Sequence, residues 1–171
     1  MDLKSKIREV PNFPKEGILF YDITTLLKDP LAFQEVIRQL AAPFIDKKIK
    51  KVVGIESRGF IFGAPLAERL GAGLVPVRKP GKLPAAKIEE KYNLEYGSDS
   101  LAIHKDAISP GERVLIADDL LATGGTALTT ANLIRQLGGD IQGAVFVVEL
   151  AGLKGREKLK GFPITSLVVY D

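Results

Sequence analysis

The chain has 171 residues, of which 46% are hydrophobic and 26% are charged. This balance is typical of one globular domain with a sizeable buried core, and it argues against a disordered protein. Lys and Arg number 24 against 21 Asp and Glu, so the net charge of +3 lacks the strong basic excess of a nucleic-acid-binding protein. With no cysteine and one histidine, disulfides and Cys- or multi-His zinc sites are excluded, and any metal must be a hard ion bound by oxygen atoms.

No apolar run in the sequence approaches the length that spans a membrane. The first twenty residues mix charges and prolines, whereas a secretory signal would be continuous and apolar at its centre. We therefore expect a cytoplasmic protein with no membrane partner.

The first third of the chain is predicted to be mainly helical. Apolar residues at helical spacing predict a short opening helix over residues 3–10, which Pro11 ends, and residues 12–25 are expected to be irregular. Asp29-Pro30 has the pattern of an N-cap followed by proline at the first helical position. The apolar spacing that follows predicts a helix reaching Phe44.

From residue 52 onward, short apolar runs alternate with helical patterns. Strands are predicted over 52–56, 74–78, 113–117, 141–149 and 164–169, and helices over 60–70, 126–137 and 154–160. Such alternation is typical of right-handed βαβ units. The predicted fold class is therefore α/β, with a mostly parallel twisted sheet flanked by helices.

The segment from Lys79 to Ser100 interrupts this alternation with prolines, glycines and lysines. Long insertions in compact domains are usually lids or binding loops. A plain solvent-exposed hairpin is the alternative that the residues leave open.

The segment richest in chemical groups runs from Arg113 to Thr126. There a buried strand leads into Asp118 and Asp119, and a turn of small residues then opens a helix. Ligands of open α/β sheets bind at the carboxyl ends of strands. The glycines, hydroxyls and free helix N-terminal N–H groups of residues 122–126 together make a phosphate cradle.

Two carboxylates beside an anion cradle suit a ligand that holds a phosphate close to a vicinal diol, because carboxylates accept hydrogen bonds from hydroxyls. A ribose 5-phosphate has that shape. The turn lacks the lysine of a Walker loop and the spacing of a dinucleotide fingerprint, which disfavours a nucleoside triphosphate or NAD. The alternative is an acidic strand end with Asp119 as a helix cap.

The sequence VLIADDLLATGGT, residues 114–126, resembles the phosphoribosyl-diphosphate-binding motif of type I phosphoribosyltransferases. Further blocks resemble the adenine-specific branch of that family: FPKEGILFYDI at 13–23, ESRGF at 56–60, RKPGKLP at 78–84, LEYG at 94–97 and GREKL at 155–159. Together the blocks span nearly the whole chain, and their order and spacing point to adenine phosphoribosyltransferases.

This resemblance implies a single domain over residues 1–171, with a small N-terminal hood from about residues 1–27. It implies a purine salvage reaction in which the 5-phosphoribosyl group of 5-phospho-α-D-ribose 1-diphosphate is transferred to N9 of adenine, giving AMP and diphosphate. It also implies Mg²⁺ bound through substrate oxygens and water, and a homodimer. Two alternatives stay open: a hypoxanthine-guanine or xanthine phosphoribosyltransferase, and a non-catalytic regulator of the same fold that senses phosphoribosyl diphosphate.

The resemblance also assigns residues to phosphoribosyl diphosphate. Asp118 and Asp119 would bind the ribose hydroxyls and act in catalysis. The 5-phosphate would bind to Ala122, Thr123, Gly124, Gly125 and Thr126. The diphosphate would face Arg58, Lys79 and Lys82, and the family often has a cis peptide just before the arginine in Ser57-Arg58.

For the base, the resemblance implies that Phe20 stacks on adenine, and the backbone near Leu19 and Tyr21 can read its polar edge. Glu95 in the LEYG block is the candidate that accepts the proton of N9 or tunes the ring, with Tyr96 as a substrate-binding neighbour. A solvated loop carboxylate is the alternative for Glu95, because catalysis can rest on positioning alone.

Overall fold

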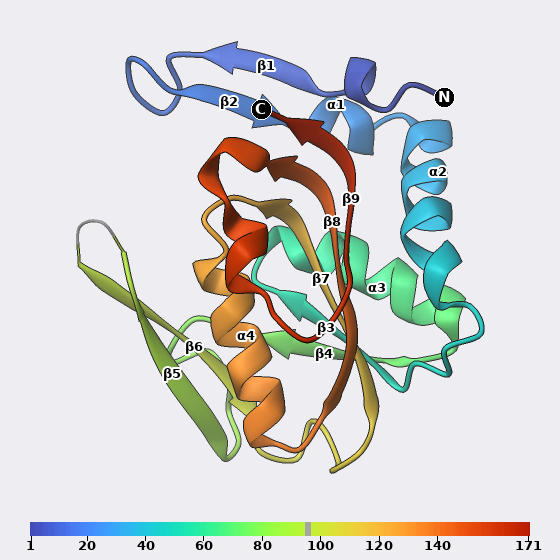
Figure 1. Cartoon of the computed structure of the whole chain (residues 1–171), viewed down its shortest axis with the longest axis vertical. Coiled ribbons are helices and arrows are strands. Elements are labelled where there is room, and N and C mark those ends of the chain that lie inside the picture. Colours follow the sequence, from blue (N-terminus) through green and yellow to red (C-terminus); the bar gives the residue numbers. More distant parts are fainter. Residues whose placement is uncertain (95–96) are drawn as a thin grey trace.

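The computed structural model describes residues 1–94 and 97–171, which are organised around a five-stranded sheet (Figure 1). The strand order is β4-β3-β7-β8-β9, with β3 at Lys51–Ile55, β4 at Gly73–Val77, β7 at Arg113–Leu121, β8 at Asp140–Leu150 and β9 at Ile164–Tyr170. Each strand runs parallel to its neighbours. The predicted α/β class and parallel sheet are therefore confirmed.

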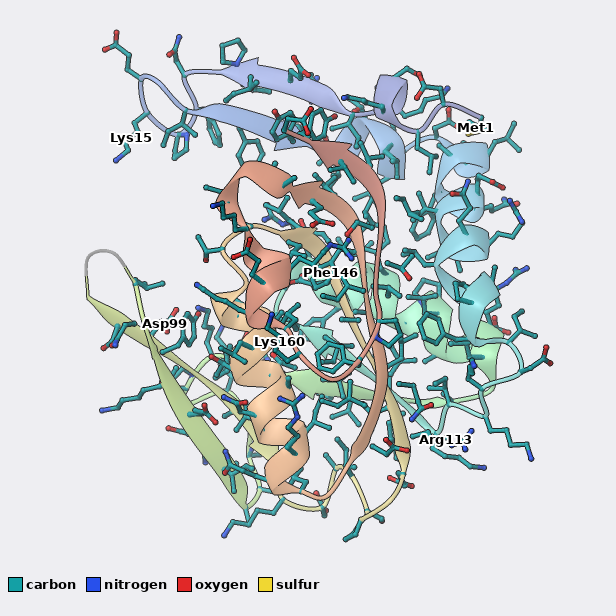
Figure 2. The ribbon with its side chains drawn as sticks, in the orientation of Figure 1. Met1, Lys15, Asp99, Arg113, Phe146 and Lys160 are labelled. Carbon is teal, nitrogen blue, oxygen red and sulfur yellow. The ribbon has the colours of Figure 1, made fainter. Side chains whose placement is uncertain are left out.

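Helices cover both faces of this sheet. α2 (Pro30–Ala41) and α3 (Arg58–Leu70) lie on one face, and α4 (Gly125–Gln136) lies on the other (Figure 1). Each face has its own hydrophobic cluster: β7 contributes Leu115 and Ala117 to the first and Val114 and Ile116 to the second. This alternation is expected of a strand buried on both sides. Phe146 of β8, labelled in Figure 2, is fully buried in the second cluster.

The helix starts follow the predicted signals closely. The side chain of Asp29 accepts hydrogen bonds from the N–H groups of Leu31 at 3.0 Å and Ala32 at 3.1 Å, so it caps α2 as expected. The last predicted turn, however, is a 3-10 helix at Ala42–Phe44. The helix predicted over 154–160 is likewise replaced by 3-10 helices at Ala151–Leu153 and Gly155–Lys158. No described helix is long and apolar enough to cross a membrane.

The N-terminal segment differs from its prediction. The chain forms a 3-10 helix at Lys4–Lys6, strands β1 (Arg8–Pro11) and β2 (Leu19–Asp22), and a short helix α1 (Thr24–Leu27). The opening helix over 3–10 and the irregular segment over 12–25 were therefore wrong predictions. Leu3 and Ile7 are buried as their spacing suggested, but Val10 pairs with Phe20 across an antiparallel hairpin. We call β1 and β2 the N-terminal hairpin. It lies across the ends of β8 and β9 (Figure 1).

The insertion after β4 forms a second hairpin, of β5 (Lys87–Asn93) and β6 (Ser98–His104). The described part of this segment therefore contains a hairpin, whereas the prediction of a lid or binding loop concerns its function. Its β5 strand is tied to α4, because Asn132 Nδ2 and Gln136 Nε2 donate to the two carboxylate oxygens of Glu90 at 2.8 and 2.9 Å.

Strand β7 is four residues longer than predicted, and the extra residues shape the site. Its pairing with β3 ends at Gly54–Ala117, whereas its pairing with β8 continues to Leu121–Glu149. Residues 118–121 therefore have one free edge beyond the end of β3. The chain adds β4 on one side of β3 and adds β8 and β9 on the far side of β7, so the strand order reverses between β3 and β7. The connecting helices α3 and α4 accordingly leave towards opposite faces. Open α/β sheets bind ligands at such a point.

Candidate active site

A cavity of about 430 Å³ lies at this reversal point. Its walls come from the turn after β3, the end of β7 with the following turn, and the insertion. The lining consists of Glu56, Ser57, Arg58, Lys79, Tyr92, Asp118, Asp119, Leu120, Leu121, Ala122, Thr123, Gly124, Thr126 and Ala127. The predicted carboxylates and most of the predicted phosphate loop therefore share one cavity with Arg58 and Lys79. Gly125 is the first residue of α4 and does not line it.

The phosphate loop, residues 122–126, lies directly against the 3-10 helix that starts at Gly155. Gly124 has φ +83°, a left-handed conformation suited to glycine, and a Cβ there would lie 2.5 Å from the carbonyl oxygen of Gly155. A Cβ on Gly155 would in turn lie 2.3 Å from the carbonyl oxygen of Ala122. Only glycines at 124 and 155 let the loop and the 3-10 helix approach this closely. Their contact holds the loop beside the first turn of α4. The N–H groups of that turn have no partners within the helix and suit an anion.

The two adjacent carboxylates are in different electrostatic states. Arg58 Nε lies 2.7 Å from Asp119 Oδ2. Asp118 Oδ1 accepts a hydrogen bond from the backbone N–H of Asp119 at 2.8 Å. Burial raises the pKa of Asp118 well above its ordinary value, and the charge of Asp119 raises it further. Asp119 is thus charge-paired, whereas Asp118 has no full counter-charge of its own.

Glu56 holds the basic segment in place at the mouth of the cavity. Its Oε2 accepts a hydrogen bond from the backbone N–H of Lys79 at 2.7 Å, and its Oε1 bonds the ammonium of Lys82 and lies 3.4 Å from Arg78 Nη2. Burial raises the pKa of Glu56, but the hydrogen bonds from Lys82, Lys79 and Arg78 outweigh it and hold the pKa below its ordinary value. Lys82 therefore reaches the site through Glu56 and does not itself line the cavity.

The ammonium of Lys79 bonds the carboxylate of Asp99, and Tyr92 Oη lies 3.4 Å from Lys79 Nζ. The hydrogen bond with Asp99 raises the pKa of Lys79 and lowers that of Asp99. Sequence reasoning missed Glu56, Tyr92 and Asp99 as site residues. Glu56 had a signal, an acid at the carboxyl end of a buried strand. Tyr92 and Asp99 had none, because they are brought together only by the register of the β5–β6 hairpin.

A second, more apolar cavity of about 150 Å³ adjoins the first, and the two share Arg58, Asp119 and Leu120. Its other walls are residues 18–21 and 23 of the N-terminal segment and Val148 and Leu150 of β8. Phe20 lines this cavity, and its ring centroid lies 6.0 Å from the Arg58 guanidinium carbon and 5.1 Å from that of Phe13, edge-on. Leu19, Phe20 and Tyr21 thus lie together in the wall of a cavity beside the main one, as the base-binding prediction requires.

The register of the N-terminal hairpin decides which peptide groups of β2 are free. Pro11 is opposite Leu19, and proline has no N–H, so this pair cannot exchange two hydrogen bonds. Antiparallel pairs alternate between bonded and non-bonded, so Phe20 and Asp22 bond to β1. The N–H and C=O groups of Leu19 and Tyr21 then point to the other edge of β2, which pairs with no strand in the described residues. These are the two residues predicted to read the base.

Two expectations from the resemblance need separate mention. The cis peptide lies between Glu56 and Ser57, one bond earlier than the position expected just before Arg58. Glu95 and Tyr96 lie outside the described residues, so their roles stay predictions.

The chain is similar to known proteins over its whole length. The family model described as "Phosphoribosyl transferase domain" matches residues 23–164. The adenine phosphoribosyltransferase of Alkaliphilus oremlandii is 58% identical over 171 residues, covering 100% of this chain and 99% of that protein. The chain belongs to the adenine phosphoribosyltransferase family.

Solved structures of adenine phosphoribosyltransferases have the same fold. That of Thermoanaerobacter pseudethanolicus has a TM-score of 0.94 and 54% identity, covering 99% of this chain and 98% of that one. That of Saccharomyces cerevisiae, complexed with D-2,5-dideoxy-2,5-imino-altritol 1,6-bisphosphate and adenine, has a TM-score of 0.91 and 46% identity over 97% and 96% of the chains. The protein is therefore a purine salvage glycosyltransferase that forms AMP and diphosphate from adenine and phosphoribosyl diphosphate, as predicted.

Proposed function

We propose that the protein performs this transfer with phosphoribosyl diphosphate in the 430 Å³ cavity and adenine in the 150 Å³ cavity. The observation that carries the proposal is that the two cavities share Arg58, Asp119 and Leu120. C1 of the ribose and N9 of adenine then meet along this shared wall. Holding two reactants in such proximity removes much of the entropic barrier to their reaction.

In this arrangement the 5-phosphate binds the loop of residues 122–126, where N–H groups of the α4 start favour an anion. Asp118 and Asp119 accept hydrogen bonds from the ribose hydroxyls. The proposal is supported by the chain itself, since Leu120 and Leu121 alone separate the carboxylates from the loop and all of these line the same cavity except Gly125. The substrate is therefore held at both ends of its ribose.

Departure of diphosphate leaves positive charge on the ribose and adds negative charge to the leaving group, and both must be stabilised. The carboxylate of Asp119 stabilises the ribose, and that of Asp118 joins it when ionised. Arg58, Lys79 and Lys82 stabilise the diphosphate. Each of these three cations is paired with a carboxylate in the free protein, so the diphosphate competes with or joins an existing anionic partner.

Mg²⁺ belongs to the proposal as the cofactor. Among the described residues, no group of three or more His, Cys, Asp or Glu side chains could hold a metal ion. Mg²⁺ usually keeps several waters and binds one or two carboxylates together with substrate phosphates. Asp118 and Asp119 at the cavity offer such oxygens, so the residues fit an ion held mainly by substrate oxygens and water. When bound, the ion neutralises charge on the diphosphate.

For the base, Phe20 stacks on adenine while the free N–H and C=O groups of Leu19 and Tyr21 bond its polar edge. Adenine presents an amino donor beside a ring acceptor, whereas hypoxanthine presents the reverse pattern. Hypoxanthine would leave buried groups unpaired at about 1–3 kcal/mol each. In this proposal Glu95 accepts the proton of N9 or tunes the ring, and Tyr96 is a substrate-binding neighbour.

The proposal extends to a cytoplasmic homodimer. A dimer through the α3 and residue 78–91 region is supported by two exposed apolar side chains, Ile61 on α3 and Leu74 on the edge strand β4. Sedimentation at micromolar concentration tests it, and a monomer would contradict the assembly without affecting the reaction.

The reaction itself is tested by measuring kcat/KM for adenine, hypoxanthine and guanine, each with phosphoribosyl diphosphate and Mg²⁺. We expect adenine to be preferred by about 10⁴ or more, because the site reads polar groups that the other bases lack. Phe20→Ala should raise KM for adenine more than KM for phosphoribosyl diphosphate. Comparable values for adenine and hypoxanthine would overturn the assignment of the base cavity while leaving the phosphoribosyl site standing.

A further inference from the structure

Tyr170, the penultimate residue, stacks against the base-reading strand from outside the cavities. Its ring lies 3.8 Å from that of Tyr21, centroid to centroid, at an interplanar angle of 27°. Tyr170 is 6% exposed, and Figure 1 shows the end of β9 meeting the N-terminal hairpin beside β2. The last strand of the sheet therefore contacts one of the two residues whose peptide groups face the base cavity.

This contact matters because the N-terminal hairpin is not part of the five-stranded sheet. In the described residues β2 pairs only with β1, so side chains must hold it at its distance from the sheet. The hairpin is fastened near its start, where Thr25 Oγ1 donates to the carbonyl oxygen of Lys6 at 2.7 Å and Lys6 pairs with Asp29 at 2.8 Å. The Tyr21–Tyr170 stack fastens it at the reading strand itself.

Tyr170 is also linked to the base cavity through strand pairing. It is the register partner of Leu150, the last residue of β8, and Leu150 and Tyr21 both line that cavity. One side chain thus contacts β2 and lies on the strand that pairs with β8, which contributes Val148 and Leu150 to the wall of the base cavity. Displacing it would change the width of the cavity rather than its chemistry.

The ring of Tyr170, and not its hydroxyl, makes these contacts. The hydroxyl oxygen is buried and has no hydrogen-bond partner. The ring carries the stack with Tyr21 and lies 4.6 Å from the ammonium of Lys4. Stacked aromatic pairs stabilise a structure beyond the contribution of their buried area. Phenylalanine should therefore replace Tyr170 without loss, whereas an aliphatic side chain should not.

We propose that Tyr170 is a positioning residue that sets the place of β2 and thereby the preference for adenine. The inference rests on the proposed role of Leu19 and Tyr21 in reading the base. It assigns to the end of the chain a part in specificity, exerted through Tyr21 and without contact to the substrate.

The test compares Tyr170→Phe and Tyr170→Leu with the wild type, using KM for each substrate, kcat, and the ratio of kcat/KM for adenine to that for hypoxanthine. We expect Tyr170→Leu to raise KM for adenine about tenfold and to reduce the ratio similarly, with KM for phosphoribosyl diphosphate within about twofold. Tyr170→Phe should match the wild type. Phe162→Leu is the matched control, because this aromatic ring lies before the opposite end of β9, packed near Arg135.

The outcomes separate this inference from the proposed function. A wild type without preference for adenine would refute the base-reading role on which the inference rests. A selective wild type whose Tyr170→Leu variant keeps both the KM for adenine and the ratio would overturn the inference alone, as would a Tyr170→Phe variant that behaves like Tyr170→Leu. If Tyr170→Leu does not fold, Tyr21→Leu removes the same stack from the other side and must show the same selective rise in KM for adenine.

Discussion

Nε of Arg58 and Oδ2 of Asp119 lie 2.7 Å apart, joining the turn after β3 to the end of β7 where those strands separate. The carboxylate is nearly buried, with 9% of the Asp119 side chain exposed, whereas 48% of the Arg58 side chain is exposed. The guanidinium can therefore bind a second anion from the cavity while its first partner stays in place. In the proposed arrangement, this pair serves both substrate groups, with Asp119 bonded to the ribose and Arg58 to the diphosphate.

Asp119→Asn should lower kcat at least about tenfold with the fold intact, because it removes a charged acceptor near the developing ribose cation and the anchor of Arg58. Steady-state kinetics checks the rate, and circular dichroism checks the fold. A folded variant with wild-type kcat would remove Asp119 from the mechanism.

The buried side chain of Asp118 should lower the free energy of unfolding at neutral pH. Burial and the charge of Asp119 raise its pKa in the folded protein, so the folded state binds its proton more tightly than the unfolded chain does. The free energy of unfolding therefore falls as pH rises from the ordinary aspartate value of about 3.9 towards the raised value. Asp118→Asn stays neutral, so we expect a higher Tm than wild type at pH 7.

This gain in Tm should shrink as pH is lowered towards 4, and the same variant should lose at least about tenfold in turnover. Thermal melts at the two pH values and a kinetic assay check both parts. A variant with a lower Tm than wild type at pH 7 would contradict the destabilisation that we attribute to the Asp118 carboxylate.

Removal of divalent ions should abolish turnover. In the proposed arrangement Mg²⁺ is held mainly by oxygens of phosphoribosyl diphosphate and by water, so we expect EDTA to capture it readily. Activity should return when Mg²⁺ is added in excess over the chelator. Full turnover in metal-free buffer would refute the role of the ion.

Gly155→Ala should weaken binding of phosphoribosyl diphosphate although Gly155 does not line the cavity. The new Cβ would lie 2.3 Å from the carbonyl oxygen of Ala122 and push the phosphate loop out of place. We expect KM for phosphoribosyl diphosphate to rise at least about tenfold, with KM for adenine much less affected. Gly152→Ala is the control, since its Cβ would make only an ordinary contact at 3.6 Å.

Asp99→Asn should tighten binding of phosphoribosyl diphosphate. In the proposed arrangement Asp99 competes with the diphosphate for Lys79. The side chains of Asp99 and Lys79 are about one third exposed, at 31% and 38%. Pairs with such exposure contribute about 1 kcal/mol at most, so we expect a Kd lower by about two- to fivefold. Titration calorimetry checks it, with the exposed Asp106→Asn as control. Weaker binding would mean that Asp99 orients Lys79 instead.

Local signals predicted the parts of the fold that depend on local sequence. The strands buried on both faces have continuous apolar runs, and Asp29 marks the start of α2 through its own hydrogen bonds. The N-terminal hairpin could not be predicted in this way. Residues 3–10 have helical spacing and residues 12–25 have no regular pattern, and only the pairing of Val10 with Phe20 across a turn makes strands of parts of both.

The site residues also separate into those that local sequence predicts and those that it does not. Asp118, Asp119 and the phosphate loop lie within residues 118–126 of one motif. Its resemblance to the phosphoribosyl-diphosphate-binding motif therefore predicted them together. Glu56 with Lys82 and Lys79 with Asp99 are pairs separated by 26 and 20 residues. Such pairs arise from the three-dimensional arrangement of the turn after β3 and the β5–β6 hairpin, which no local pattern encodes. The length of β7 likewise depends on its neighbour β8.

Because the N-terminal hairpin pairs with no strand of the five-stranded sheet in the described chain, the residues proposed to read the polar edge of adenine are encoded apart from the motif proposed to bind phosphoribosyl diphosphate. On this proposal, substitutions within the N-terminal hairpin can alter the choice of base without changing residues 118–126. The Tyr21–Tyr170 stack connects the N-terminal hairpin to the last strand of the five-stranded sheet. A chimaera that imports a foreign N-terminal segment would therefore need an aromatic residue at position 21 to dock it on this sheet.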